Sequence, residues 1–483
     1  MSAIEGLPTQ SSSPGRAQPE RLARGVLSTF DIAASTLANI APAMSFYFGF
    51  AFIVATSGIA APLTVIAAAI AIALLGNTVS QFSMVKPSTG SFVSFIGSTF
   101  GGYAGVVAAV VTTCGYIIAI SSVIAISGAW TETILNHYFS VNIPWQIFTL
   151  ILTVGAGLLI TAGAKPSTKV AGLAFLFELV LLLGVSVVLL IQHSGHINAQ
   201  PFNPSNLHNG FSGLSLGFPL CIYLFIGWES SVALAEESHD PRHAVPRAVF
   251  LSVAVIAVVY IFLTYSTVVG FDQNAGALTA SDVPFVSAAT GVGSLVLFLC
   301  YIAGFTSILG SLIGATNAQA RILFSAGREG LLPSVVGRVT AKQRTPYMAF
   351  IVFLGIGLGL SFIFGSSGGT AGAINFFGQI STLGTMLILV AYLFTNLALP
   401  FYMRRHHADR FNMFTHLVLP LLGVFAVGFP LEQLAKPGQE APFNLYPWIA
   451  LGVIIVGAIY AAYVYRKDPT ISERVGSIVA DAE

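Results

Sequence analysis

The stretch 217–247 reads GFPLCIYLFIGWESSVALAEESHDPRHAVPR, and it decides the fold. Its first half is apolar enough for lipid, but Gly227 interrupts the run and Glu229 follows two residues later. A glycine break frees backbone groups that need new partners, and an ionisable side chain is costly at membrane depth. Broken helices of this kind form binding sites at the bilayer midplane. The stretch therefore predicts a functional site inside a membrane-spanning helix.

The composition is that of an integral membrane protein. Hydrophobic residues make up 55% of the 483 residues and charged residues only 8%, whereas soluble domains carry about 25% charged residues. The net charge of +1 gives no global field that would attract nucleic acid. The three cysteines lie in apolar runs, which predicts buried thiols rather than a disulfide or metal framework. We expect no metal and no cofactor.

Twelve apolar runs are long enough to span a bilayer, which takes about 20 residues. They lie at residues 27–55, 59–84, 101–132, 144–163, 169–191, 212–235, 246–270, 290–320, 346–365, 372–399, 412–430 and 445–465. If the N-terminus is cytoplasmic, every Lys and Arg except Lys436 falls in a cytoplasmic segment. The positive-inside rule therefore predicts a multi-pass protein of the plasma membrane with both termini in the cytoplasm. Residues 1–25 read as a disordered cytoplasmic tail, and residues 466–483 as a second cytoplasmic tail.

The first span carries a second break signal, Ala41-Pro42-Ala43. Proline removes a backbone donor and clashes with the preceding helical turn. Five spans separate this signal from the break at Gly227, and an odd offset inverts the topology. The pattern predicts a five-plus-five inverted repeat over residues 26–400, with discontinuous helices 1 and 6 that meet at a central site. Helices 11 and 12, within residues 401–465, lie outside the repeat. The alternative is that Pro42 only kinks a continuous helix.

Four stretches carry a resemblance to a known family. They are KPSTGSF at 86–92, FIGWE at 225–229, ESHDPRHAVPRA at 237–248 and RILFSAGREGLLP at 321–333. On these residues the chain resembles the amino acid–polyamine–organocation permeases over about residues 25–465. The resemblance implies the leucine-transporter type fold and secondary active transport of amino acids or related amines by alternating access. The chain departs from the family at Ala41-Pro42-Ala43, where many members have a Gly-Ser-Gly type break.

The two breaks are where we expect the substrate. The half-helix that begins near Met44 and Ser45 offers unpaired N–H groups and a positive dipole end to a carboxylate. The resemblance implies that carbonyls near Ile226 take the ammonium and that Tyr223 is an aromatic gate over the substrate. Aromatic packing against neighbouring helices is the alternative for Tyr223 and Trp228. The predicted substrate-binding residues are Ala41, Pro42, Ala43, Met44, Ser45, Tyr223, Phe225, Ile226, Gly227, Trp228 and Glu229.

Two acids at membrane depth, Glu178 and Glu229, are candidates for ion coupling. An unpaired buried carboxylate is expensive, so each should hold its proton near neutral pH unless a cation is present. Glu229 also opens the second half-helix, where the dipole favours a carboxylate; the alternative for both acids is a structural, hydrogen-bonded role. The hydroxyls of Thr306 and Ser307 could instead bind sodium, or could bond to carbonyls of their own helix. Proton coupling is favoured over sodium.

Three classes of function compete. The first is a permease for amino acids or related amines, proton-coupled, sodium-coupled or exchanging. The second is a channel or a non-transporting sensor, which the internal repeat and the twin broken helices disfavour. The third, an intramembrane enzyme, is disfavoured because the spans contain no recognisable catalytic motif. The expected partners are a small-molecule substrate and the lipid bilayer.

Overall fold

The computed structural model describes residue 22 and residues 24–162, 164–208 and 210–476. Within these residues the fold is all-helical, and the only strand-type pairing is an isolated bridge between Leu27 and Ser238. Most of the predicted N-terminal tail, residues 1–25, and the end of the predicted C-terminal tail, residues 477–483, lie outside the described residues.

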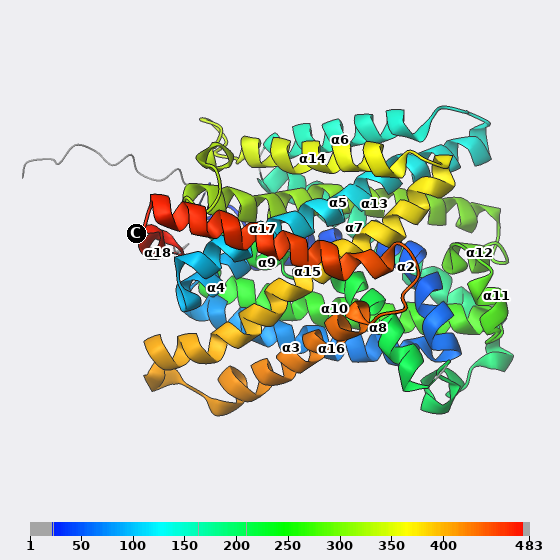
Figure 1. Ribbon diagram of the computed structural model, residues 1–483. Helices are drawn as coiled ribbons and strands as arrows, with labels where there is room; N and C mark the ends of the chain where they lie inside the picture. Colours follow the sequence, from blue (N-terminus) through cyan, green and yellow to red (C-terminus); the bar gives the residue numbers. More distant parts are fainter. Residues whose placement is uncertain (1–21, 23, 163, 209, 477–483) are drawn as a thin grey trace, which may run out of the picture.

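The helices of the first half of the chain include both predicted breaks (Figure 1). They are α1 (Thr29–Ile40), α2 (Pro42–Ser57), α3 (Ala61–Val85), α4 (Ser91–Phe100), α5 (Gly102–Phe139), α6 (Trp145–Thr161), α7 (Ala164–Gln192), α8 (Phe211–Phe225) and α9 (Ser230–Ala233). A short 3-10 turn, η5 (Ala235–Glu237), follows α9.

The second half of the chain adds nine more helices. They are α10 (Pro241–Gly270), α11 (Ala275–Thr279), α12 (Pro284–Ala289), α13 (Ser294–Arg328), α14 (Tyr347–Gly365), α15 (Gly369–His406), α16 (Leu419–Ala435), α17 (Tyr446–Lys467) and α18 (Ile471–Arg474).

Length and hydropathy qualify nine of the described helical runs as membrane spans, and three shorter apolar helices lie at Ser91–Phe100, Trp145–Thr161 and Gly217–Ala233. One of the nine, Thr29–Val85, has 57 residues. At about 1.5 Å per residue such a run is far longer than a bilayer about 30 Å thick. It divides at Ala41 and again at Gly58–Ala60, where Gly58 has a φ of 65°. The chain is thus a multi-pass helical membrane protein, and the count of twelve stays a prediction.

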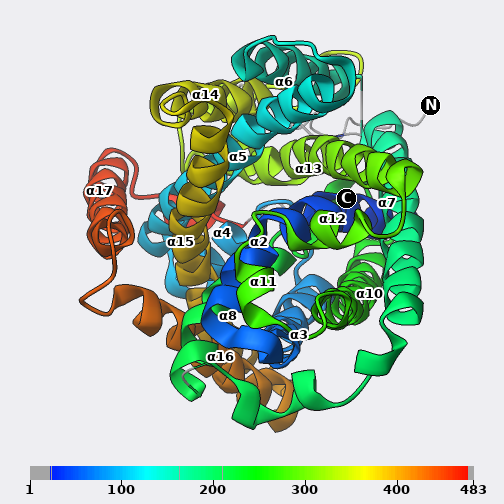
Figure 2. The same cartoon turned by 90° about the vertical axis from the view of Figure 1, so that its right-hand side faces the viewer.

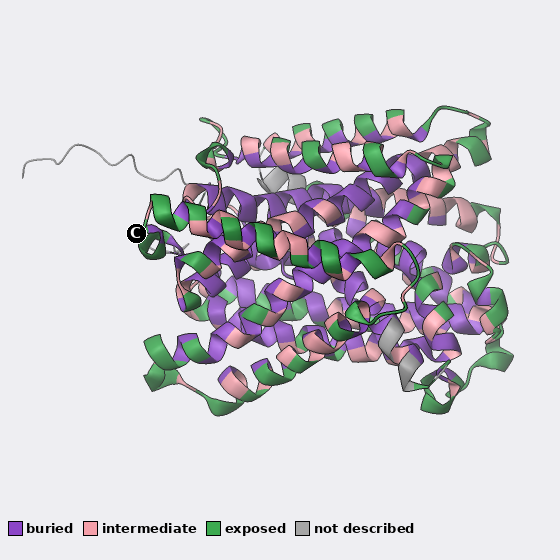
Figure 3. Cartoon of the chain, in the orientation of Figure 1, coloured by how far each residue is buried: buried purple, intermediate pink, exposed green. Residues whose placement is uncertain are grey.

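Long helices pack side by side around a buried centre. α5 lies along α15, α10 along α3, and α13 along α7. Seen from the end of the bundle, α2 is central, while α16 and α17 lie at the periphery (Figure 2). Buried residues fill the interior, and exposed apolar residues cover the outer faces of peripheral helices such as α6 and α17 (Figure 3). This distribution suits a bilayer, because the outward surface is apolar.

One end of the bundle carries both described ends of the chain, and we call it the termini end. The backbone N–H groups of Val26 and Leu27 both donate to the Glu237 carbonyl, at 2.9 Å each. The N–H of Gly476 donates to the Glu329 carboxylate at 2.9 Å. Residues of the predicted C-terminal tail therefore fold back: α17 includes residues 466 and 467, and α18 packs against the bundle.

Candidate substrate site

The first break lies between α1 and α2 at Ala41. Its φ of 52° and ψ of 69° place it in the left-handed region, which costs an L-residue about 1–2 kcal/mol. Two features make this conformation available: the residue before a proline is disfavoured in a right-handed helix, and Pro42 needs no hydrogen-bond acceptor. Pro42 then starts α2, because its fixed φ suits the first helical position. The break is a defined turn rather than a kink.

The second break, residues 226–229, separates α8 from α9. Gly227 has a φ of 109°, and a Cβ there would lie 3.0 Å from the Asn39 side chain. Only glycine meets both demands. Glu229 folds back over the break: its carboxylate accepts from the Gly227 N–H at 3.0 Å and from the Tyr116 hydroxyl of α5 at 2.7 Å. The helix after the break, α9, has only four residues.

This geometry corrects the sequence-based reason for Glu229. Glu229 does stand at the start of the half-helix α9, as expected, but the expected stabilisation by the helix dipole is not what this helix offers. A helix of one turn has almost no dipole to offer, and Glu229 makes no cap bond to α9. Its carboxylate instead satisfies the N–H group that the break sets free.

Side-chain hydrogen bonds tie the two breaks together. The Asn39 amide donates to the Ser230 hydroxyl, and the Thr36 and Ser231 hydroxyls lie 2.8 Å apart. Ser311 of α13 donates to the Asn39 carbonyl at 3.2 Å. All of these side chains are buried. The end of α1, the second break and α13 therefore form one hydrogen-bonded unit.

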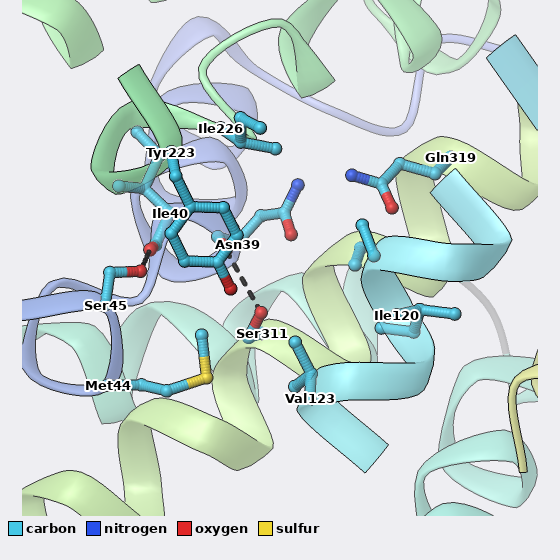
Figure 4. A pocket seen from close by; sticks show the side chains of 12 residues that line it. Asn39, Ile40, Met44, Ser45, Ile120, Val123, Tyr223, Ile226, Ser311 and Gln319 are labelled. Carbon is cyan, nitrogen blue, oxygen red and sulfur yellow. Dashed lines mark hydrogen bonds between the residues drawn. The ribbon is translucent and has the colours of Figure 1, made fainter. Parts of the chain in front are cut away.

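A small cavity of about 30 Å³ lies between these elements (Figure 4). Its polar groups come from the breaks and from α13, and its apolar wall from the middle of α5. The lining residues are Asn39, Ile40, Met44, Ser45, Ala119, Ile120, Val123, Tyr223, Ile226, Ser311, Ala315 and Gln319. No lining residue carries a formal charge at neutral pH. The volume suffices for water but not for an amino acid, so the walls must move apart before a substrate of that size can enter.

Four of the predicted substrate-binding residues line the cavity: Met44, Ser45, Tyr223 and Ile226. Tyr223 is buried, and its hydroxyl lies near those of Ser122 and Ser381. Its ring meets Phe377 edge-on at 5.8 Å between centroids. The eight lining residues outside the predicted substrate-binding set are Asn39, Ile40, Ser311, Ala315, Gln319 and the apolar wall of α5, Ala119, Ile120 and Val123.

The start of α2 differs from the expectation of unpaired N–H groups. The N–H of Ala43 donates to the Glu178 carboxylate at 3.3 Å, and the N–H of Met44 donates to the Ser307 hydroxyl at 3.0 Å. The N–H of Ser45 donates to the Ala41 carbonyl at 2.9 Å. In this structure α7 and α13 thus supply the acceptors that we had assigned to a substrate carboxylate.

Glu178 and Ser307 form a compact polar group beside the first break. Each side chain accepts a backbone N–H of α2, the two lie close enough to interact, and both are almost fully buried. Within the described residues Glu178 has no ion-pair partner. The structure therefore joins two of the predicted coupling residues at the start of α2.

Other predicted residues lie away from the cavity. Trp228 packs against Tyr392, at 5.7 Å between ring centroids, and Phe225 packs against Tyr260 at 5.3 Å. Thr306 donates to the Ala303 carbonyl of its own helix at 3.1 Å and faces an apolar cavity between α6, α7 and α13. The structure thus gives the packing alternative for Trp228 and the own-helix alternative for Thr306, and it separates Thr306 from Ser307.

Two buried ion pairs close the termini end beneath the second break. Arg321 Nε of α13 lies 2.8 Å from the Glu237 carboxylate, with side-chain exposures of 0% and 2%. Arg328 pairs with Glu236 in a similarly buried position. Burial raises the pKa of the Glu237 carboxyl, and Arg321 opposes that rise. Separating η5 from α13 would leave these charges without their partners.

A family model described as Amino acid permease matches residues 31–470. The chain belongs to the amino acid permease family. The family resemblance proposed from the sequence is therefore confirmed, and the family is one of membrane transporters.

Curated relatives align over most of their own length. A branched-chain amino acid permease of Bacillus subtilis is 21% identical, over 83% of this chain and 85% of the relative. A branched-chain amino acid permease of Lactococcus lactis is 24% identical, over 80% and 83%. A methylthioribose transporter of Bacillus subtilis is 23% identical, over 83% and 85%.

A solved structure shares the fold. It is Mhp1, a nucleobase-cation-symport-1 family transporter, in a closed conformation with bromovinylhydantoin bound. The TM-score is 0.56 at 12% sequence identity, over 94% of this chain and 98% of the other. At this identity the likeness concerns the fold alone.

Proposed function

We propose that this family member is a secondary active transporter that moves neutral amino acids with apolar side chains across the plasma membrane by alternating access. The proposal includes the predicted inverted repeat and places the termini end in the cytoplasm, as the distribution of Lys and Arg favours. The observation that carries it is the cavity at the two helix breaks, which is polar at the breaks, apolar along α5 and lined by no charged side chain.

The lining favours one class of substrate. Backbone dipoles and amide groups can solvate the two charged ends of a zwitterion without formal counter-charges. An extra charge on the substrate side chain would lie in this cavity without a counter-ion, which is costly. An aliphatic side chain could instead pack against Ala119, Ile120 and Val123. The names of two relatives, branched-chain amino acid permeases, agree with this choice.

Proton coupling through Glu178 is part of the proposal. Glu178 is buried, has no ion-pair partner in the described part of the chain, and bonds to the first residues of α2. A movement of α2 would therefore change the surroundings of the carboxyl group directly. Sodium coupling is the runner-up, because the Ser307 hydroxyl and the Glu178 carboxylate offer oxygen atoms to a sodium ion beside a helix break. An exchanger would use the same site without net ion movement.

Uptake into proteoliposomes tests the function. Radiolabelled leucine should accumulate when the external solution is the more acidic, and a protonophore should abolish the accumulation. Unlabelled isoleucine and valine should compete, whereas glutamate, lysine and methylthioribose should not. Uptake that requires sodium and does not respond to an imposed pH gradient would show that sodium, and not the proton, is the coupling ion. Equilibration without accumulation under either gradient would favour the exchanger.

Tyr223→Ala should weaken substrate binding without unfolding the protein. The substitution removes a ring that lines the cavity and its hydroxyl contacts with Ser122 and Ser381. We expect the substrate concentration for half-maximal uptake to rise about tenfold. The binding free energy of an aromatic contact, together with the apolar area that it buries, is at least that of a tenfold change in affinity. Tyr465→Ala, at an exposed position of α17, is the matched control. Unchanged half-saturation at equal expression would remove Tyr223 from the site.

A further inference from the structure

The segment Ile471–Gly476, which follows the last long helix, is packed into the termini end of the bundle. Its α18 lies beside the C-terminal label in Figure 1. Ile471 is fully buried and Val475 is only 4% exposed, while Ser472, Glu473 and Arg474 between them are exposed. The segment therefore presents two apolar side chains to the bundle and a polar side to solvent.

Three glycines form the seat for these apolar side chains. A Cβ on Gly97 or on Gly105 would lie 2.3 Å or 2.7 Å from a methyl group of Val475. A Cβ on Gly102 would lie 2.8 Å from Ile471. Any larger residue would thus displace the segment. The seat lies where α4 meets the start of α5, which is separate from the cavity at the helix breaks.

Two hydrogen bonds fasten the segment to different parts of the bundle. The N–H of Gly102 donates to the Ser472 hydroxyl at 3.1 Å, and the N–H of Gly476 donates to the Glu329 carboxylate at 2.9 Å. Arg474 pairs with Asp468, which holds the turn after α17. One contact is thus on α5, and the other is at the end of α13.

The contact at α13 is next to the buried ion pairs that close the termini end. Glu329 directly follows Arg328, which pairs with Glu236 of η5. The Lys86 ammonium, at the end of α3, would lie 3.3 Å from a Cβ on Gly476. The segment therefore sits where the ends of α3, α5 and α13 meet, beside the charges that must separate if η5 is to leave α13.

We propose that residues 471–476 form a releasable latch that holds the termini end closed and slows the opening of the central cavity toward that end. The inference rests on the proposed function in one respect, namely that the cavity opens alternately to the two ends. While the latch is seated, it fills the glycine seat and holds the Glu329 carboxylate in place. Release of the latch empties the seat on α4 and α5 and frees the Glu329 carboxylate at the end of α13, so η5 can separate from α13 more often.

The latch should respond to pH on its own side of the membrane. Burial raises the pKa of Glu329 to about 7, and the Gly476 N–H, Arg328 and Lys86 lower it while Glu236 raises it. Arg474 also lies nearby, because a Cβ on Gly330 would be 3.4 Å from its guanidinium group. A hydrated carboxyl titrates near about 4.3. The seated form therefore binds its proton more tightly than the released form, and its stability falls as the pH rises through about 7.

A cysteine at the cavity reports the opening of the termini end without any transport assay. The probe is Gln319→Cys, labelled with a membrane-impermeant methanethiosulfonate reagent from the termini side of vesicles, with the unsubstituted chain as background. The chain with Gln319→Cys alone is the parent. Four variants that also carry Gln319→Cys are compared with it: a chain that ends at Asp468, Ile471→Asp, Val475→Asp and the exposed control Glu473→Ala. The readout stays valid if the substrate assignment is wrong, so the two proposals can fail separately.

Shortening the chain or placing Asp at either buried position should speed labelling about tenfold or more. Each change removes at least one buried apolar side chain, and that loss shifts the equilibrium between the seated and the released latch at least about tenfold toward release. Glu473→Ala should match the parent. Because the thiolate is the reactive form, labelling of any cysteine speeds up from pH 6 to pH 8. The parent is therefore compared with Glu329→Gln at each pH, and the ratio of the parent's rate to the variant's should be higher at pH 8 than at pH 6. Unchanged labelling in the shortened chain overturns the latch. Loss of folded protein in the shortened chain and in both Asp variants also overturns it, because the segment would then be part of the obligatory fold.

Discussion

Glu178→Gln should abolish the accumulation of substrate against a gradient and leave counterflow exchange at the parental rate. The residue is buried beside the first break, where its carboxylate accepts the Ala43 N–H at 3.3 Å. A carboxyl group there can take up a proton when the site faces one side and release it when the site faces the other. Glutamine keeps the shape and the acceptor oxygen but cannot carry the proton. Exchange needs no net proton movement, so it should survive.

The experiment compares two assays on the same preparation. Uptake driven by an imposed pH gradient measures accumulation, and uptake into vesicles preloaded with unlabelled substrate measures exchange. Glu132→Gln is the control, because Glu132 is an acid in α5 that accepts from Thr370 at 2.7 Å and does not line the cavity. A Glu178→Gln protein that accumulates normally would exclude Glu178 from coupling. Glu229, bonded to Tyr116 and Gly227, would then be the candidate.

Both breaks could be predicted from sequence because their causes are local. Pro42 lacks an N–H and disfavours a right-handed helical conformation in the residue before it, so a break at Ala41 follows from backbone sterics, whereas its left-handed φ does not. Gly227 has a φ that other residues avoid. Glu178 and Glu229 were conspicuous because acids are rare at membrane depth. Each of these signals belongs to one or two residues and needs no knowledge of the rest of the fold.

Partners across helices could not be predicted in the same way. Asn39 and Gln319 are ordinary polar residues in sequence, and only the packing of α1, α5 and α13 places them at the cavity. Thr306 and Ser307 are adjacent in sequence, yet Thr306 faces an apolar cavity and Ser307 meets the start of α2, because successive side chains on a helix diverge by about 100°. The acceptors for the first N–H groups of α2 come from two other helices. A single sequence does not reveal such pairings.

The stretch after the last span shows the same limit. Residues 466–483 read as a cytoplasmic tail, and the helical spacing of Ile471 and Val475, four residues apart, does not say which surface they would pack against. Their burial depends on the absence of side chains at Gly97, Gly102 and Gly105, more than 350 positions earlier. Small residues that let segments approach closely are common in membrane helices. Their presence alone did not indicate which segment they accommodate.

Arg321→Met should strongly destabilise the folded protein unless Glu237 is changed with it. The pair is almost completely buried, with 2.8 Å between Arg321 Nε and the Glu237 carboxylate. Removing one partner of a buried pair costs about 3–5 kcal/mol, because the other charge stays buried alone. Glu236 lies beside Glu237 and raises its pKa further, which adds to the cost of an ionised Glu237. A loss of this size is a large part of the free energy of unfolding of a typical domain, which is about 5–15 kcal/mol.

The double variant Arg321→Met with Glu237→Leu separates the charge from the packing. Two apolar side chains in place of a buried pair are often neutral in stability, so most of the loss should be recovered. Thermal unfolding of purified protein in detergent, followed by size-exclusion chromatography, measures both effects. Arg405→Met is the matched control, since Arg405 is exposed at the end of α15. A single variant as stable as the parent would contradict the prediction. A double variant as unstable as the single would show that Arg321 acts through its other contacts, the Asn317 side chain and the Phe350 ring.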